Sequence, residues 1–196
     1  MKFKNKIVAF GAVLLFLSCA TNPFTGKKTM ALVPNSQLFP TAFQQYNQFL
    51  TENKVIKGTA DAQMVTKVGQ KIAVAAERWL NANGYQGYLN DYKWEYNLVD
   101  DKTVNAWCMP GGKIVVYTGI LPITQNEAGL AAVMGHEVAH ALANHGQQRM
   151  SAGQLQQIGA VAGTIAVSGS SQETQQIFGT AYGLGTQFGV MLPFSR

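Results

Sequence analysis

The sequence predicts an α+β fold that is mainly helical and carries a small antiparallel sheet. The chain has 196 residues, 47% hydrophobic and 13% charged. This is enough apolar material for one sizeable core and excludes a disordered chain. Apolar residues recur at helical spacing over several long segments, whereas strand-like patterns are confined to two short ones. Two cysteines are too few for a disulfide scaffold or a four-cysteine zinc site.

The first half of the chain predicts two helices. Residues 39–50 and 59–81 place apolar side chains on one helix face, and Asn83-Gly84 ends the second segment. Residues 20–40 are rich in turn-forming pairs and are expected to form an extended tether.

Two strands are expected near the middle. Residues 92–99 alternate between apolar and polar positions, and residues 113–118 are rich in branched side chains. The glycine-ended segment 105–112 between them is expected to be irregular. The two strands predict a small antiparallel sheet.

A third helix is expected over residues 124–148. Thr124 and Glu127 have the spacing of a capping box at its start. Residues 150–195 contain two glycine-punctuated apolar stretches with one charged residue, Glu173. Their glycine spacing resembles a membrane-helix packing motif, but the stretches are short and glutamine-rich, which favours closely packed soluble helices.

The N-terminus has the pattern of an export signal. A basic start is followed by an apolar run of 11 residues, Ile7 to Leu17, and by small residues. Residues 16–19, Phe-Leu-Ser-Cys, resemble the lipobox of bacterial lipoproteins. The resemblance implies a signal peptide over residues 1–18 and acylation of Cys19. It also implies a lipid anchor in the outer membrane that leaves the protein facing the periplasm, since no Asp follows Cys19.

The net charge of +5 does not indicate nucleic-acid binding. Without residues 1–18, which contain Lys2, Lys4 and Lys6, 12 basic and 10 acidic residues remain. No stripe rich in Lys or Arg is left to follow a phosphate backbone.

The chemistry of the chain is concentrated in the sequence His136-Glu137-Val138-Ala139-His140. Residues four apart share one helix face, so His136 and His140 can hold one zinc ion. Glu137 lies about 100° further round the helix, where its carboxylate can take a proton from a metal-bound water. The alternative is a helix with two surface histidines and an idle glutamate.

A catalytic zinc site normally has three protein ligands. The metzincin pattern fails here, because Ala143 and Gly146 occupy the positions where it needs Gly and His. His145 and Glu173 remain as alternatives for the third ligand.

The HExxH sequence and the preceding segment 105–119 together resemble the M48 family of zinc metallopeptidases. The segment Asn22-Pro23-Phe24-Thr25-Gly26 is similar to the outer-membrane lipoprotein branch of that family. The resemblance implies a zincin-like (gluzincin) domain over residues 41–196, after a lipid-anchored tether over 19–40. It also implies an edge strand that pairs with extended peptide substrate, with these candidate substrate-binding residues: Asn105, Ala106, Trp107, Cys108, Gly111 and Gly112.

In that family the third ligand is a Glu on a later helix, after a Pro-aromatic-Ser-Arg segment. Residues 193–196 resemble this lead-in, so the third ligand is expected beyond Arg196 and the domain to be incomplete at its C-terminus. The function expected is zinc-dependent endoproteolysis of misfolded envelope proteins, with one Zn²⁺ per chain. The alternatives are a chaperone-like envelope lipoprotein that does not cleave, or an inactive shortened copy.

Overall fold

The computed structural model describes residues 19–186, so the expected signal peptide, residues 1–18, lies outside the described part. The chain divides into two compact units. Of the described residues, unit 1 holds 19–21, Lys28–Val33 and 147–186. Unit 2 holds Asn22–Lys27 and Pro34–Gly146 and contains the HExxH sequence.

Unit 2 is built on a four-stranded sheet in the order β3-β4-β6-β5. Its strands are β3 (Val55–Ile56), β4 (Glu95–Val99), β5 (Ala106–Met109) and β6 (Lys113–Tyr117). The segment expected to be irregular therefore contains strand β5. The sheet is mixed and not antiparallel throughout, because β4 and β6 run parallel. Strands β5 and β6 form a tight antiparallel hairpin, and β6 lies between β5 and β4 in the sheet. The hairpin therefore sets the direction in which β6 runs beside β4.

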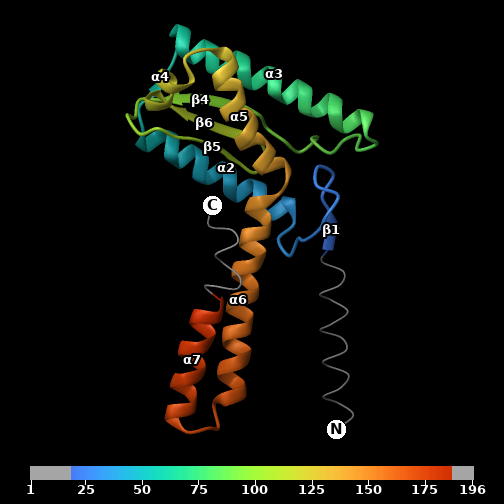
Figure 1. Ribbon diagram of the computed structural model, residues 1–196, viewed down its shortest axis with the longest axis vertical. Helices are drawn as coiled ribbons and strands as arrows, with labels where there is room; N and C mark the ends of the chain where they lie inside the picture. Colours follow the sequence, from blue (N-terminus) through green and yellow to red (C-terminus); the bar gives the residue numbers. More distant parts are fainter. Residues whose placement is uncertain (1–18, 187–196) are drawn as a thin grey trace. The chain divides into compact units, whose positions relative to one another are not determined.

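Helices cover both faces of this sheet (Figure 1). On one face lies α2 (Asn35–Glu52), whose buried Tyr46 packs against Val99 and Val115. On the other face, α3 (Ala60–Ala82) packs on β4, and α5 (Glu127–Leu142) packs on α3 and β5. The helix expected over 59–81 is confirmed, and its N-cap is Thr59, whose hydroxyl accepts a hydrogen bond from the Ala62 N–H.

The start of the HExxH helix differs from the expected capping box. Thr124 is the last residue of the short helix α4 (Leu121–Thr124), which follows the 3₁₀ turn Thr118–Ile120, and its hydroxyl donates to the Leu121 carbonyl. Asn126 is the N-cap of α5, and its side-chain oxygen accepts from two main-chain N–H groups. Glu127 forms ion pairs with lysines of α3, so its carboxylate has partners outside its own helix.

The end of the HExxH helix also differs from expectation. The helix ends at Leu142 and does not continue to Gln148. Asn144 adopts a left-handed conformation, with φ 58°, which is a common way to terminate a helix. A separate helix, α6 (His145–Val167), then begins. The HExxH sequence therefore occupies the C-terminal half of α5.

Unit 1 contains a short antiparallel pair, β1 (Cys19–Thr21) with β2 (Lys28–Met30), most of α6, and α7 (Gln172–Thr186). Residues 19–40 are thus structured and differ from the extended tether expected. Gly159 and Gly163 of α6 lie against Tyr182 and Phe178 of α7, so these glycines allow close helix packing, as expected.

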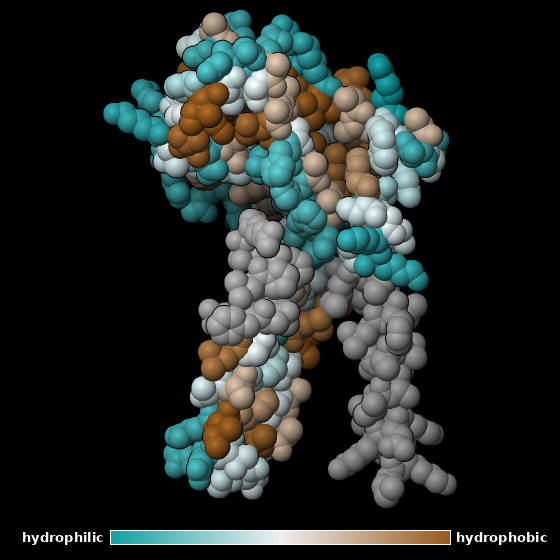
Figure 2. Space-filling view, in the orientation of Figure 1, coloured by the Kyte–Doolittle hydropathy of each residue, from teal (hydrophilic) through white to brown (hydrophobic). Residues whose placement is uncertain are grey.

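The outer surfaces of α6 and α7 carry exposed apolar side chains (Figure 2). They are Met150, Ile158, Val161, Ile165, Ile177 and Leu184. Between residues 19 and 186, no helix combines the length and hydrophobicity needed to cross a membrane.

Candidate active site

The orientation of α5 follows from its apolar residues. Leu130, Met134 and Val138 recur every four residues and are at most 2% exposed, so they fix this stripe of the helix against the core. His136 and His140 lie on a different side of the same helix and remain accessible. The packing of α5 thus presents both imidazoles outward.

The two histidines converge through one nitrogen each. The Nε2 atoms of His136 and His140 are 3.0 Å apart, and the rings meet edge to face at 88°. Two nitrogens bound to one tetrahedral zinc ion, each about 2.0–2.1 Å from it, lie about 3.3–3.4 Å from each other. The observed separation is within a few tenths of an ångström of that requirement, so the pair fits zinc.

Glu137 lies on α5 directly before the buried Val138. Its side chain is half-buried, and its charge acts on Cys108 of strand β5. Burial raises the pKa of the Cys108 thiol, and the Glu137 carboxylate raises it further. The Glu137 carboxylate is therefore near enough to strand β5, on which α5 packs, for its charge to act on the Cys108 thiol.

Strand β5 is the edge of the sheet beside α5. The Asn105 carbonyl accepts a hydrogen bond from the Tyr117 N–H at 3.1 Å, which sets the pairing with β6. Hydrogen-bonded and non-bonded positions alternate along an antiparallel pair. The main-chain groups of Ala106 and Cys108 therefore point away from β6, toward the open edge. This edge can accept the main chain of an extended peptide.

The other candidate substrate-binding residues have structural roles. The Trp107 side chain lies on the face of the sheet that α2 covers, where its ring packs on Tyr46 and Phe49. Its Nε1–H donates to the Tyr117 hydroxyl. A Cβ on Gly111 would lie 2.5 Å from Phe43, and one on Gly112 would lie 2.7 Å from Trp94. The glycine pair thus permits a turn with positive φ against aromatic rings. The assignment of these residues to substrate binding stays a prediction.

The third zinc ligand is not found in the described part of the chain. No group of three His, Cys, Asp or Glu side chains within residues 19–186 can hold a metal ion. The Nδ1 atom of His145 lies 2.6 Å from Nδ1 of His140, on the side of the ring opposite the Nε2 that faces His136. Glu173, expected in a loop, lies in the first turn of α7.

A group that the sequence interpretation missed holds the end of the HExxH helix. The Asn22 side chain is 1% exposed, and its Nδ2 donates to the Leu142 carbonyl at 3.1 Å. The Tyr88 hydroxyl donates to the same carbonyl at 3.3 Å and accepts from Asn144 Nδ2 at 3.0 Å. This set of hydrogen bonds closes the last turn of α5, two residues after His140.

The segment that carries Asn22 is itself tightly held. Asn22 Oδ1 accepts from the main-chain N–H groups of Phe24 and Thr25, which is an Asx turn. The Phe24 ring stacks on Trp79 of α3, with ring centroids 4.7 Å apart. The sequence showed this segment as a turn and as a family marker. Its contact with α5 joins residues 120 positions apart in the chain, so no pattern in the neighbouring sequence indicates it.

The sequence of the chain is similar to those of known proteins. The chain matches peptidase family M48 over residues 61–196. It is 37% identical over 108 residues to the mitochondrial metalloendopeptidase OMA1 of Schizosaccharomyces pombe, which is 55% of this chain and 30% of that protein. It is 27% identical over 156 residues to the metalloprotease LoiP of Escherichia coli, which is 76% of this chain and 57% of LoiP.

The matches to OMA1 proteins thus span less than a third of those proteins, and the match to LoiP spans little more than half. The family match covers well over half of the present chain and includes α3, the whole sheet except β3, and the HExxH helix. The mainly helical fold with its small sheet agrees with a zincin-like domain. This chain belongs to peptidase family M48.

Proposed function

We propose that this chain is a zinc-dependent endopeptidase that cleaves extended segments of unfolded polypeptide. One observation carries the proposal. The convergent Nε2 atoms of His136 and His140 and the carboxylate of Glu137 belong to a helix that packs on the open edge of β5. Candidate metal ligands and a candidate proton acceptor thus belong to the helix that packs on this edge, which supports the proposal.

In this proposal His136 and His140 hold zinc through Nε2. Zinc, when bound, supplies a Lewis acid that polarises the substrate carbonyl and makes water acidic enough to attack at neutral pH. Glu137 accepts the proton of the attacking water and returns it to the amine that leaves when the peptide bond breaks. The main chain of β5 at Ala106 and Cys108 binds and orients the substrate as an added strand.

Strand addition limits the substrates. A peptide can pair with β5 only where its own main chain is extended and unpaired, which excludes segments held in folded structure. Unfolded or misfolded protein is the class that meets this condition. Polypeptides are thus the partners of the site.

We further propose that the protein is a lipoprotein of the cell envelope. The support is the sequence alone: the signal pattern over residues 1–18 and the lipobox ending at Cys19. Acyl chains on Cys19 would anchor it to the outer membrane at the periplasmic face without a spanning helix. Equal palmitate labelling of the wild type and of Cys19→Ser in a bacterial host would overturn this.

A second function is favoured by one observation. His136 and His140 are the two ligands that the described residues supply, and catalytic zinc sites normally use three. In this second function the open edge of β5 holds unfolded polypeptide without cleaving it.

The test measures cleavage and binding of unfolded casein by the full chain. The proposal predicts cleavage that a zinc chelator abolishes and that Glu137→Gln reduces about 10²–10⁴-fold, the usual effect of losing an acid–base group. Binding of casein without cleavage, unchanged by the chelator and by Glu137→Gln, would reject proteolysis in favour of the holding function.

A further inference from the structure

The sheet has a second open edge, on the side away from β5. Strand β3 is two residues long and pairs only with Leu98 and Val99 of β4. The chain leaves the sheet at Gly58, where φ is +76°. The first half of β4 therefore has no neighbour on that side among residues 19–186.

The main-chain groups exposed there can be identified from the pairing on the other side. The N–H groups of Lys93 and Glu95 donate to the carbonyls of Gly111 and Gly112, at 2.9 and 3.0 Å. Because main-chain groups of successive strand residues point to opposite sides, those of Trp94 and Tyr96 point away from β6. Two residues of unpaired sheet edge are thus available.

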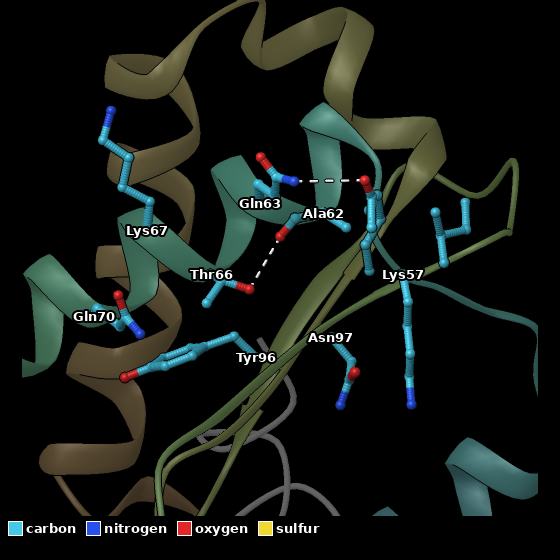
Figure 3. Close-up of a pocket in the computed structure, with 11 residues that line it drawn as sticks. Lys57, Ala62, Gln63, Thr66, Lys67, Gln70, Tyr96 and Asn97 are labelled. Atoms are coloured by element: carbon cyan, nitrogen blue, oxygen red, sulfur yellow. Dashed lines mark hydrogen bonds between the residues drawn. The ribbon is translucent and has the colours of Figure 1, made fainter.

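A hollow of about 360 Å³ opens beside this edge, between β4 and the first half of α3 (Figure 3). Its lining includes Lys57, Gln63, Thr66, Lys67 and Gln70. A second hollow, of about 460 Å³, continues along α3, since Lys67 and Gln70 line both. We call the two together the basic groove, and its charged side chains are those of Lys57, Lys67, Lys71 and Arg78.

The groove carries an excess of positive charge. Its lining residues include three lysines and one arginine and no carboxylate. Glu127 of α5 binds Lys67 and Lys71, and these two lysines hold the pKa of its carboxyl below the usual range. One carboxylate thus pairs with two ammonium groups and neutralises only part of the charge.

The spacing of the cations suits an extended chain. Lys67, Lys71 and Arg78 follow one another at four and seven residues and so form one stripe along α3. From first to last they span about 16 Å at the 1.5 Å rise of a helix, the length of about five residues of extended chain.

We propose that the basic groove binds an extended acidic polypeptide segment, which pairs with the main chain of Trp94 and Tyr96 while its carboxylates contact the lysines and arginine. Main-chain pairing provides affinity for any extended segment, and the charges select acidic ones. The groove lies at the edge of the sheet opposite β5. The idea that the groove holds substrate for cleavage rests on the proposed function. The binding of an acidic segment to the groove does not depend on that function.

The test uses the full chain with Glu137→Gln, so that no probe is cleaved. The probe is a fluorescein-labelled decapeptide of alternating Glu and Val, and its affinity is measured by fluorescence anisotropy. A copy in which alternate main-chain amides are N-methylated has the same charge but cannot pair as a strand. The proposal predicts binding of the first peptide, and affinity weaker by more than about tenfold for the N-methylated copy, since several hydrogen bonds are lost.

Charge reversal provides the second arm. Lys57→Glu and Arg78→Glu should each weaken binding about two- to fivefold, as expected for exposed charge pairs. Lys102→Glu is the matched control, because Lys102 is exposed and lies outside the groove lining. Its substitution changes the net charge by the same amount as the other two. Its affinity should equal that of the parent, and all three variants should keep the parent's melting temperature.

Three results would overturn the proposal: equal affinity for the two peptides, equal weakening by Lys102→Glu, or binding to phosphatidylglycerol vesicles with none to the acidic peptide. The last would make the groove a surface for anionic lipid. Failure of the proposed function is measured separately, by casein cleavage in the chain that retains Glu137.

Discussion

Asn22 donates a hydrogen bond through Nδ2 to the carbonyl of Leu142, at 3.1 Å, across 120 residues of chain. The bond closes the C-terminal turn of the helix that carries His136 and His140. A helix end leaves its last carbonyls without partners inside the helix, and a buried end must find them elsewhere. The position of His140 therefore depends on a side chain from the N-terminal part of the molecule.

The Asn22→Asp variant tests this dependence. The carboxylate can still accept from the N–H groups of Phe24 and Thr25, but it has no proton to donate to Leu142. We expect a loss of about 1–3 kcal/mol in the free energy of unfolding, measured in urea, together with weaker zinc binding. The control is Asn53→Asp, which loses a side-chain hydrogen bond to the Phe49 carbonyl at the end of α2. Zinc affinity equal in the two variants would contradict the dependence.

Gly112 should be intolerant of a side chain for two reasons. Its φ is +88°, and a Cβ would lie 2.7 Å from the Trp94 ring. Gly112→Ala should lower the free energy of unfolding by about 2–4 kcal/mol, from backbone strain and overpacking together. Gly84→Ala is the matched control, because Gly84 has φ +85° with nothing within 4 Å of an added Cβ. It should cost about 1–2 kcal/mol, from strain alone. Equal losses would show that the contact with Trp94 does not matter.

Cys108 should be unreactive in the folded protein. Burial, and to a lesser extent Glu137, raise the pKa of its thiol, so it stays protonated where a free cysteine begins to ionise. Alkylation by iodoacetamide at pH 8, measured in Cys19→Ser, should be more than about tenfold slower in buffer than in urea. Because the folded pKa is raised, ionisation above the unfolded pKa opposes folding, and stability should fall as the pH rises past that value. Equal alkylation rates would place the thiol in contact with solvent.

Much of the fold could be predicted from local patterns. The helix over 59–81 was visible from its apolar spacing and its Asn83-Gly84 stop, and the two strands from alternation and from branched side chains. The parallel pairing of β4 and β6 could not be predicted, because it depends on the position of β5 at the edge of the sheet, next to β6. The end of α5 was missed for a similar reason, since Asn144 in a left-handed conformation is stabilised by the distant Tyr88.

The candidate site shows the same division. The spacing of His136 and His140 implied two ligands on one helix face, and the structure brings their Nε2 atoms together. Gly111 and Gly112 were named as substrate-binding candidates without any sign that they lie against the rings of Phe43 and Trp94. A sequence identifies a glycine but not the surface that approaches it.

The measurement that tests the central claim most directly is zinc affinity of the full chain, titrated against a competing chelator, for the wild type, His136→Ala, His145→Ala and Glu137→Gln. The account predicts that His136→Ala weakens binding by more than about 100-fold, beyond the 10–100-fold that loss of an outer partner costs. Glu137→Gln and His145→Ala should keep the wild-type affinity within a few-fold, because neither removes an Nε2 ligand. Wild-type affinity in His136→Ala, or loss of binding in His145→Ala alone, would contradict the assignment of His136 and His140 as the zinc ligands.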